Sequence, residues 1–125
     1  ERPGLVGAKM FPMFTSQGQY PGEEVIFSLT DPITDGEEIT RLVEEGFIVR
    51  TRADSGGVEP DNNDTTRFEA ALASGAHTIA TDYPGPVDGM EYWIDIPEGN
   101  PSRCNPVVAP IWCTPSEIEN LETTV

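Results

Sequence analysis

The strongest constraint on the fold is a helix-to-strand unit that occurs twice in succession. In the first unit, apolar residues at spacings of three and four predict a helix over residues 36–45, capped by Asp35. Gly46 ends this helix, and the β-branched and aromatic segment 47–52 predicts a strand. Another strand is predicted ahead of this unit, at residues 25–31. Because strands and helices alternate, the strands are expected to lie parallel in one sheet.

The second unit repeats this order after a polar loop. Residues 64–74 predict a helix that is capped by Asn63 or Asp64 and ended by Gly75. The segment 77–83 predicts the strand that follows. Short helix-to-strand connections of this kind are typical of a parallel α/β sheet with helices packed on it.

The remaining residues divide the chain into two regions. Residues 1–97 hold the alternating elements and finish with a short edge strand at 91–97, whereas residues 98–125 read as an irregular tail rich in proline. In this tail, Cys104 and Cys113 suit a small disulfide loop better than a metal site, which needs three or four ligands. Two reduced, buried thiols are the alternative. A disulfide in turn predicts a secreted, extracellular or periplasmic protein.

Two helix-to-strand units are too few to complete a parallel sheet. Two helices and three or four strands leave sheet edges open, whereas a complete (β/α)₈ barrel takes about 250 residues. We therefore predict an α/β fold that forms the C-terminal part of a (β/α)₈ barrel of the TIM type. The other strands are expected from a second chain or from a missing N-terminal portion.

Charge and hydropathy exclude two classes of partner. The net charge of −15, from 22 acidic and 7 basic residues, opposes binding to nucleic acid. No stretch approaches the roughly 20 apolar residues that a transmembrane helix needs. Trp93 and Trp112 are expected to pack in the protein interior and not at a lipid surface.

Charged side chains gather where two predicted strands end. Arg50 and Arg52 are two residues apart on one strand, so both project from the same face and form a local anion site. Asp54 follows this strand, and Asp82 and Tyr83 end the next one. In parallel barrels these carboxyl ends form the mouth that carries the active site. The set suits a phosphate or a polyol; an arginine–aspartate ion-pair lattice that closes the barrel is the alternative.

The same segments resemble a known family. VRTRAD at 49–54, DTTRFEAALASGA at 64–76 and TDYP at 81–84 are similar, in order and spacing, to a strand, a helix and a strand end of the calcium-dependent phosphoinositide phospholipases C of bacteria and fungi. LVGAKMF and SLTDP resemble the preceding strands of that family, and SRCNPV at 102–107 resembles its terminal segment.

The resemblance implies a secreted phosphodiesterase that cleaves inositol phospholipids, with calcium assisting the phosphate and two histidines on earlier strands acting as acid and base. His77 is the one histidine here, at the start of a strand and away from the barrel mouth, so neither a catalytic residue nor a metal ligand is expected in this chain. The chain is expected to be active only with its N-terminal portion. The residues expected to bind the lipid headgroup are Arg50, Arg52, Asp54, Asp82 and Tyr83.

Two other functions fit part of this pattern. A glycerophosphodiester phosphodiesterase has a similar barrel, although VRTRAD together with ALASGA argues against it. A non-catalytic secreted module that binds sugars or lipid headgroups through Arg50, Arg52 and Asp82 is the second.

Overall fold

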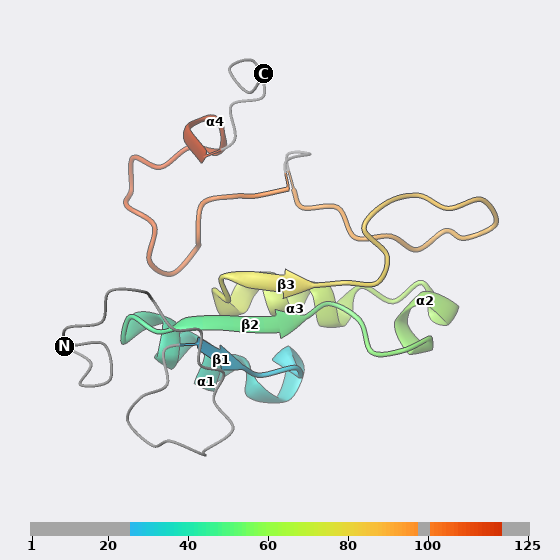
Figure 1. The fold of residues 1–125 in the computed structure, drawn as a ribbon, viewed down its shortest axis with the longest axis horizontal. Coiled ribbons are helices and arrows are strands. Elements are labelled where there is room, and N and C mark those ends of the chain that lie inside the picture. Colours follow the sequence, from blue (N-terminus) through green and yellow to red (C-terminus); the bar gives the residue numbers. More distant parts are fainter. Residues whose placement is uncertain (1–25, 98–100, 119–125) are drawn as a thin grey trace, which may run out of the picture.

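The structure, a computed structural model, describes residues 26–97 and 101–118. Its centre is a sheet of three parallel strands in the order β1 (Ile26–Ser28), β2 (Ile48–Arg52) and β3 (Thr78–Ala80), as Figure 1 shows. The three predicted strands are therefore confirmed, and so is their parallel direction; β2 is one residue shorter than expected, and β1 and β3 are several residues shorter. The described residues form no closed barrel, and the LVGAKMF segment lies outside them.

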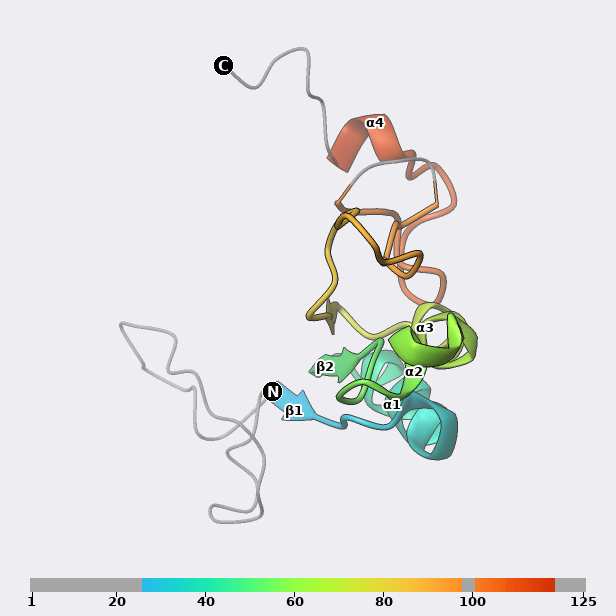
Figure 2. The same cartoon turned by 90° about the vertical axis from the view of Figure 1, so that its right-hand side faces the viewer.

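Two helices cover one face of this sheet. Helices α1 (Pro32–Glu44) and α3 (Thr66–Ser74) pack against each other and against β2, on the same side of the strands in Figure 2. The apolar side chains predicted for the first helix are all buried there together with a residue of β2; they are Ile39, Leu42, Val43 and Val49. Burial of this apolar stripe supplies the main free energy that joins helix and sheet.

Helix α1 begins earlier than predicted. Asp31, and not Asp35, is its N-cap: the Asp31 carboxylate accepts hydrogen bonds from the backbone N–H groups of Ile33 (3.2 Å) and Thr34 (3.5 Å). Pro32 occupies the first helical position, where its missing N–H is no loss and its fixed φ is helical. The strand predicted at residues 25–31 covers the true N-cap, which explains the wrong N-terminus.

The polar loop after β2 contains an unpredicted helix, α2 (Val58–Asn62). Its polar sequence gave no apolar stripe to reveal it, and Asn63 ends it in the left-handed conformation. In the next turn the Asp64 carboxylate accepts the Thr66 N–H at 2.9 Å, while Thr65 is the positional N-cap of α3. The predicted N-cap, Asn63 or Asp64, therefore lies one or two residues too early, although the Asp64 carboxylate does accept a backbone N–H of the first turn.

At the amino ends of the strands the tail packs against the end of α3. Gly75 ends α3 with a φ of 82°, and its carbonyl accepts a hydrogen bond from the Asn105 side chain at 2.6 Å. Val107 lies so close that a Cβ added at Gly75 would be 2.4 Å from a Val107 methyl group. Only glycine fits this position, because both the backbone conformation and the space exclude a side chain.

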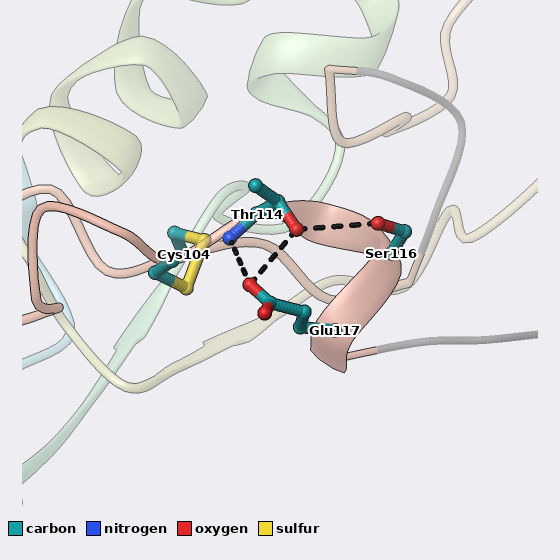
Figure 3. Close-up of a disulfide and its surroundings, with 5 residues drawn as sticks. Cys104, Thr114, Ser116 and Glu117 are labelled. Atoms are coloured by element: carbon teal, nitrogen blue, oxygen red, sulfur yellow. Dashed lines mark hydrogen bonds between the residues drawn. A yellow bond between two sulfur atoms is a disulfide. The ribbon is translucent and has the colours of Figure 1, made fainter.

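The predicted disulfide is present in the tail. Cys104 and Cys113 are bonded, with their Cα atoms 6.0 Å apart, so neither is a free thiol. Beside the disulfide, the short helix α4 (Pro115–Ile118) begins with half of a capping box: the Glu117 carboxylate accepts both the N–H and the hydroxyl of Thr114, at 3.1 and 3.0 Å (Figure 3).

Two predictions for the later part of the chain are wrong. Residues 91–97 form no strand; the segment is attached to the fold by the Ile94 N–H, which donates to the Tyr83 carbonyl at 2.8 Å. Its alternating pattern instead buries Tyr92 and Ile94 beside the sheet without strand pairing. The two tryptophans are not packed inside, since Trp93 is 42% and Trp112 70% exposed.

Candidate functional site

The two faces of β2 differ as the sequence predicts. Val49 and Thr51 are fully buried under the helices, whereas Arg50 and Arg52 are half-buried on the other face, which no described helix covers. The hydroxyl of Thr51 has no hydrogen-bond partner among the described residues, so this side chain serves packing. Alternation along the strand therefore places both guanidinium groups on the open face of the sheet.

Arg50 lies in the middle of the open face. Its Nη1 donates to the hydroxyl of Ser28 at 3.2 Å, and Ser28 is its register partner on β1. The Arg50 side chain forms no ion pair with a carboxylate among the residues that the structure describes. Its positive charge is therefore available to an anion that approaches this face.

Arg52 joins the ends of β2 and β3. Its Nη2 is 3.2 Å from a carboxylate oxygen of Asp54 and 2.8 Å from one of Asp82, and its Nε donates to the Asp54 carbonyl at 3.1 Å. The hydrogen bond to Asp54, and then the charge of Asp82, raise the pKa of Arg52 above its ordinary value. Three predicted site residues are thus brought together at the carboxyl ends of the strands.

Asp54 and Asp82 differ sharply in burial although both contact Arg52. The Asp54 carboxylate is fully buried, and besides Arg52 it accepts the Thr81 hydroxyl and the Asp82 N–H, the latter at 3.3 Å. The Asp82 side chain is 63% exposed. Asp54 therefore organises the neighbouring groups from below, and Asp82 presents its carboxylate to solvent.

Tyr83 lies against a second tyrosine. The rings of Tyr83 and Tyr92 meet edge to face, with centroids 5.4 Å apart, and the Tyr83 N–H donates to the Thr81 hydroxyl at 2.9 Å. Tyr92 is buried and its hydroxyl is 3.5 Å from the Ala53 carbonyl. Burial, and then the charge of Asp54, raise the pKa of Tyr92 to about 12, so it stays protonated at neutral pH.

Sequence reasoning missed some residues of this arrangement. Thr81 is not among the predicted site residues, yet its hydroxyl donates to Asp54 and accepts from the Tyr83 N–H. Its position directly before Asp82 was the only available signal. Tyr92 had no signal, because its contacts with Ala53 and Tyr83 arise from a chain reversal after β3 that no local pattern predicts.

Comparison with known proteins agrees with the segments that form this site. A family model described as "Phosphoinositide phospholipase C, Ca2+-dependent" matches residues 3–106, which include all three strands and the polar cluster. The chain belongs to the Ca²⁺-dependent phosphoinositide phospholipase C family. No curated protein and no solved structure is significantly similar to it.

The described residues do not fit the calcium ion that the family name implies. Ca²⁺ binds six to eight oxygen atoms, and no group of three or more potential ligand side chains converges among residues 26–97 and 101–118. Asp54, the buried carboxylate of the site, already accepts three hydrogen bonds, one of them from the Arg52 guanidinium. A second cation at this carboxylate would be repelled by Arg52 and would displace these donors.

The single histidine of the chain lies at the other end of the sheet. His77 precedes β3, and its backbone N–H donates to the Val49 carbonyl at 2.8 Å. Its Nδ1 accepts the Val49 N–H at 3.2 Å, and burial lowers the pKa of the ring. The predicted position, at the amino end of a strand and away from the arginines, is confirmed.

None of the helices in the described ranges is long and apolar enough to cross a bilayer.

Proposed function

We propose that this chain supplies part of the headgroup site of a phosphodiesterase that cleaves inositol phospholipids. One observation carries the proposal: strand β2 places both Arg50 and Arg52 on the open face of the sheet, and Arg52 meets Asp82, which follows the parallel strand β3. Carboxyl ends of parallel strands are the usual position of substrate sites in α/β proteins. The family assignment gives this anion site its substrate class.

The roles of the side chains follow from their exposure and charge. Arg50 and Arg52 would donate to phosphate or inositol oxygens, and the exposed Asp82 carboxylate would accept from a ring hydroxyl. Asp54, which is fully buried, would act on the substrate only by orienting Arg52 and Asp82. The Tyr83 ring would border the site at the end of β3, supported by Tyr92.

The catalytic acid and base are proposed to come from outside this chain. Cleavage by the inositol hydroxyl needs a base for that hydroxyl and an acid for the departing oxygen, and the chain holds one histidine, at the wrong end of the sheet. We propose that the three strands are the last strands of a (β/α)₈ barrel. Among the described residues, one face of the sheet is uncovered and β1 and β3 have open edges; both support this, because a parallel sheet is normally covered or closed. Calcium would be held by residues outside the described ranges.

A secreted location is part of the same proposal. The Cys104–Cys113 disulfide supports it, since disulfides persist in oxidising compartments.

The test measures inositol phosphate release from phosphatidylinositol vesicles by the chain alone and by the chain combined with a segment that supplies the remaining strands. We expect activity only from the combination. Arg50→Gln should then lower kcat/KM by roughly 10- to 100-fold, since a hydrogen bond to a charged group contributes about 1.5–3 kcal/mol. Arg41→Gln is the matched control, because it changes an exposed arginine in the last turn of α1, away from the carboxyl ends of the strands.

Three outcomes would contradict the proposal. Robust activity from the chain alone would place the acid and base within it. Faster hydrolysis of glycerophosphocholine than of phosphatidylinositol would favour a glycerophosphodiester phosphodiesterase. Tight binding of inositol phosphate by the chain alone, without activity in either form, would favour a non-catalytic binding module.

A further inference from the structure

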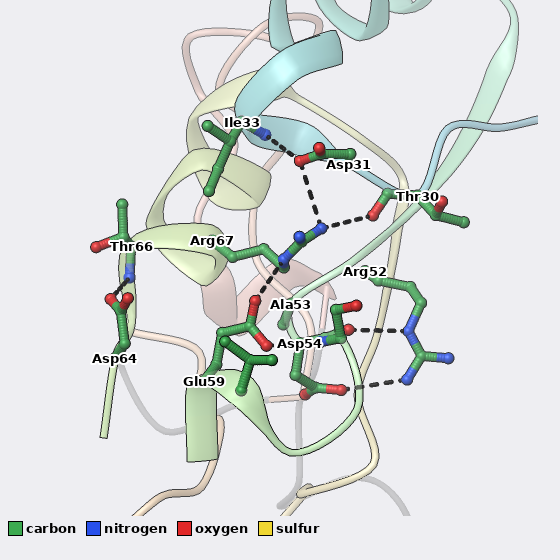
Figure 4. A network of polar contacts seen from close by, with 12 residues as sticks. Thr30, Asp31, Ile33, Arg52, Ala53, Asp54, Glu59, Asp64, Thr66 and Arg67 are labelled. Atoms are coloured by element: carbon green, nitrogen blue, oxygen red, sulfur yellow. Dashed lines mark hydrogen bonds and ion pairs between the residues drawn. The ribbon is translucent and has the colours of Figure 1, made fainter. Parts of the chain in front are cut away.

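A second arginine network lies beneath the site, centred on Arg67 of α3. Its Nε donates to the Glu59 carboxylate at 2.7 Å, and its Nη1 donates to the Thr30 carbonyl at 3.1 Å and lies 3.4 Å from the Asp31 carboxylate. Figure 4 shows the guanidinium between these three groups. The Arg67 side chain is only 16% exposed, so these are contacts of a largely desolvated charge.

The partners of Arg67 belong to two different strand-to-helix connections. Thr30 and Asp31 follow β1, and Glu59 lies in α2, within the connection that follows β2. Arg67 therefore ties together, at the carboxyl ends of the strands, two loops that share no strand pairing at this point. A lysine could not do the same, because it lacks the planar fork that donates in several fixed directions.

Glu59 links Arg67 to the segment that carries Asp54. While one oxygen of its carboxylate accepts from Arg67, the other accepts the Ser55 N–H at 2.8 Å. Ser55 directly follows Asp54, the buried carboxylate that holds Arg52 and the Asp82 N–H. Burial alone would raise the pKa of Glu59, but the Ser55 N–H and Arg67 outweigh it and lower the pKa, so the carboxylate is charged at neutral pH.

We propose that Arg67 is a positioning residue of the headgroup site: through Glu59 and the Ser55 amide it fixes Asp54, and thereby the directions of Arg52 and Asp82. The inference rests on the function proposed above for Arg52 and Asp82. Arg67 itself lies on the helix side of the β2–α2 connection and takes no part in binding the substrate. Its effect on affinity is therefore indirect and separable from that of Arg50.

The test compares Arg67→Gln and Arg67→Lys with Arg41→Gln in the protein that combines this chain with the catalytic histidines. Arg41 is a matched control, because it also pairs with two glutamates, Glu38 and Glu45, but on the exposed face of α1. The first readout is amide hydrogen exchange at Ser55 and Asp82. We expect faster exchange at both amides in the Arg67 variants, and no change there in Arg41→Gln.

The second readout is affinity for soluble inositol 1-phosphate. Misplacement of a group by about an ångström can cost up to 10²-fold in reaction rate. For affinity we expect a smaller effect: about tenfold weaker binding for Arg67→Gln, and less than a twofold change for Arg41→Gln. Arg67→Lys keeps the charge and should remain folded if Arg67→Gln does not; it should still bind severalfold more weakly than the wild type. Glu59→Gln should not weaken binding further when added to Arg67→Gln, because both act through the same contact.

The outcomes separate the two proposals. If folded Arg67 variants keep wild-type exchange at Ser55 and Asp82 and wild-type affinity, Arg67 has no positioning role. If exchange accelerates while affinity is unchanged, Arg67 holds the loop but not the binding site, and the inference is equally overturned. If the wild type neither binds inositol 1-phosphate nor cleaves phosphatidylinositol, the proposed function is wrong, while exchange still reports whether Arg67 fixes the Ser55 segment.

Discussion

The two ends of the three-stranded sheet are stabilised by different kinds of contact. At the carboxyl ends, Arg52 and Arg67 are each held by two carboxylates, in networks that are partly buried. At the amino ends, the tail packs Val107 against Gly75, and backbone groups pair with Asn105 and His77. Apolar packing and backbone hydrogen bonds thus hold the tail at the amino ends. The carboxyl ends instead carry charged side chains in partly buried positions, where desolvation is costly.

This difference supports the proposed position of the headgroup site. A buried charge network seldom adds stability over a well-packed apolar alternative of similar volume, so its presence at one end only is best explained by a site that needs fixed charges. The amino end has no such network among the described residues, and its residues have sufficient explanation in packing. The comparison can be tested by removing one group at each end.

Removal of Asp54 is expected to have the largest effect. Asp54→Ala would leave Arg52, the Thr81 hydroxyl and the Asp82 N–H without their buried acceptor. Orphaned buried donors cost about 1–3 kcal/mol each, and more when charged; since Arg52 keeps its contact with Asp82, we expect a loss of about 3–4 kcal/mol of unfolding free energy, measured by urea denaturation.

Asp82→Ala is the control for this experiment, because Asp82 pairs with the same guanidinium but is mostly exposed. An exposed ion pair contributes about 0–1 kcal/mol, so stability should hardly change while headgroup affinity falls. Equal losses of stability for the two variants would show that burial does not distinguish the two carboxylates, and the contrast between the ends would lose its basis.

Substitution of Gly75 is expected to have the largest effect at the amino end. Gly75→Ala forces a side chain into a positive φ and against Val107, with a cost of about 2–3 kcal/mol from the backbone and steric terms together. Headgroup affinity of the folded fraction should stay unchanged, because the site lies at the other end of the strands. Urea denaturation and inositol 1-phosphate titration measure the two effects.

Gly36→Ala provides the matched control, since Gly36 lies inside α1 with open space around its Cα. Alanine is favoured over glycine in a helix by up to about 1 kcal/mol, so this variant should be slightly more stable than the wild type. A stabilised Gly75→Ala variant would instead mean that Val107 does not pack where the structure has it.

Much of the fold was predictable because it depends on local pattern. The apolar spacing of Ile39, Leu42 and Val43 defined α1, and glycines marked the ends of α1 and α3. Alternation placed Arg50 and Arg52 on one face, because successive side chains of a strand point to opposite sides whatever the tertiary context. The disulfide was predictable from the cysteine count, since two nearby cysteines have few other uses in such a tail.

The contacts that organise the site were not predictable in the same way. Arg67 and Glu59 are eight residues apart across two helices, and Thr81 reaches Asp54 from another strand, so no sequence period encodes either pair. A polar segment such as α2 also lacks the apolar stripe that reveals a helix. Exposure of Trp93 and Trp112 depends on the path of the tail, which local propensity does not specify.

The smallest expected effect concerns pH, and it also separates the two ends. Burial lowers the pKa of His77, so the folded state favours the neutral ring, whose Nδ1 accepts the Val49 N–H. Because the unfolded chain then binds the proton more readily, this contribution to stability is present above a pH of roughly 6.5 and is lost as the pH falls through the folded pKa. The pKa values of Asp31 and Glu59 at the carboxyl end are lowered from ordinary carboxyl values, so those groups stay charged throughout this window.

His77→Asn places a non-titrating amide oxygen close to the position of Nδ1, and its unfolding free energy should match the wild type at pH 7.5 but decline less toward pH 5.5. An identical decline in both proteins would assign the pH dependence to another group, and the amino end would then have no titrating contact of its own.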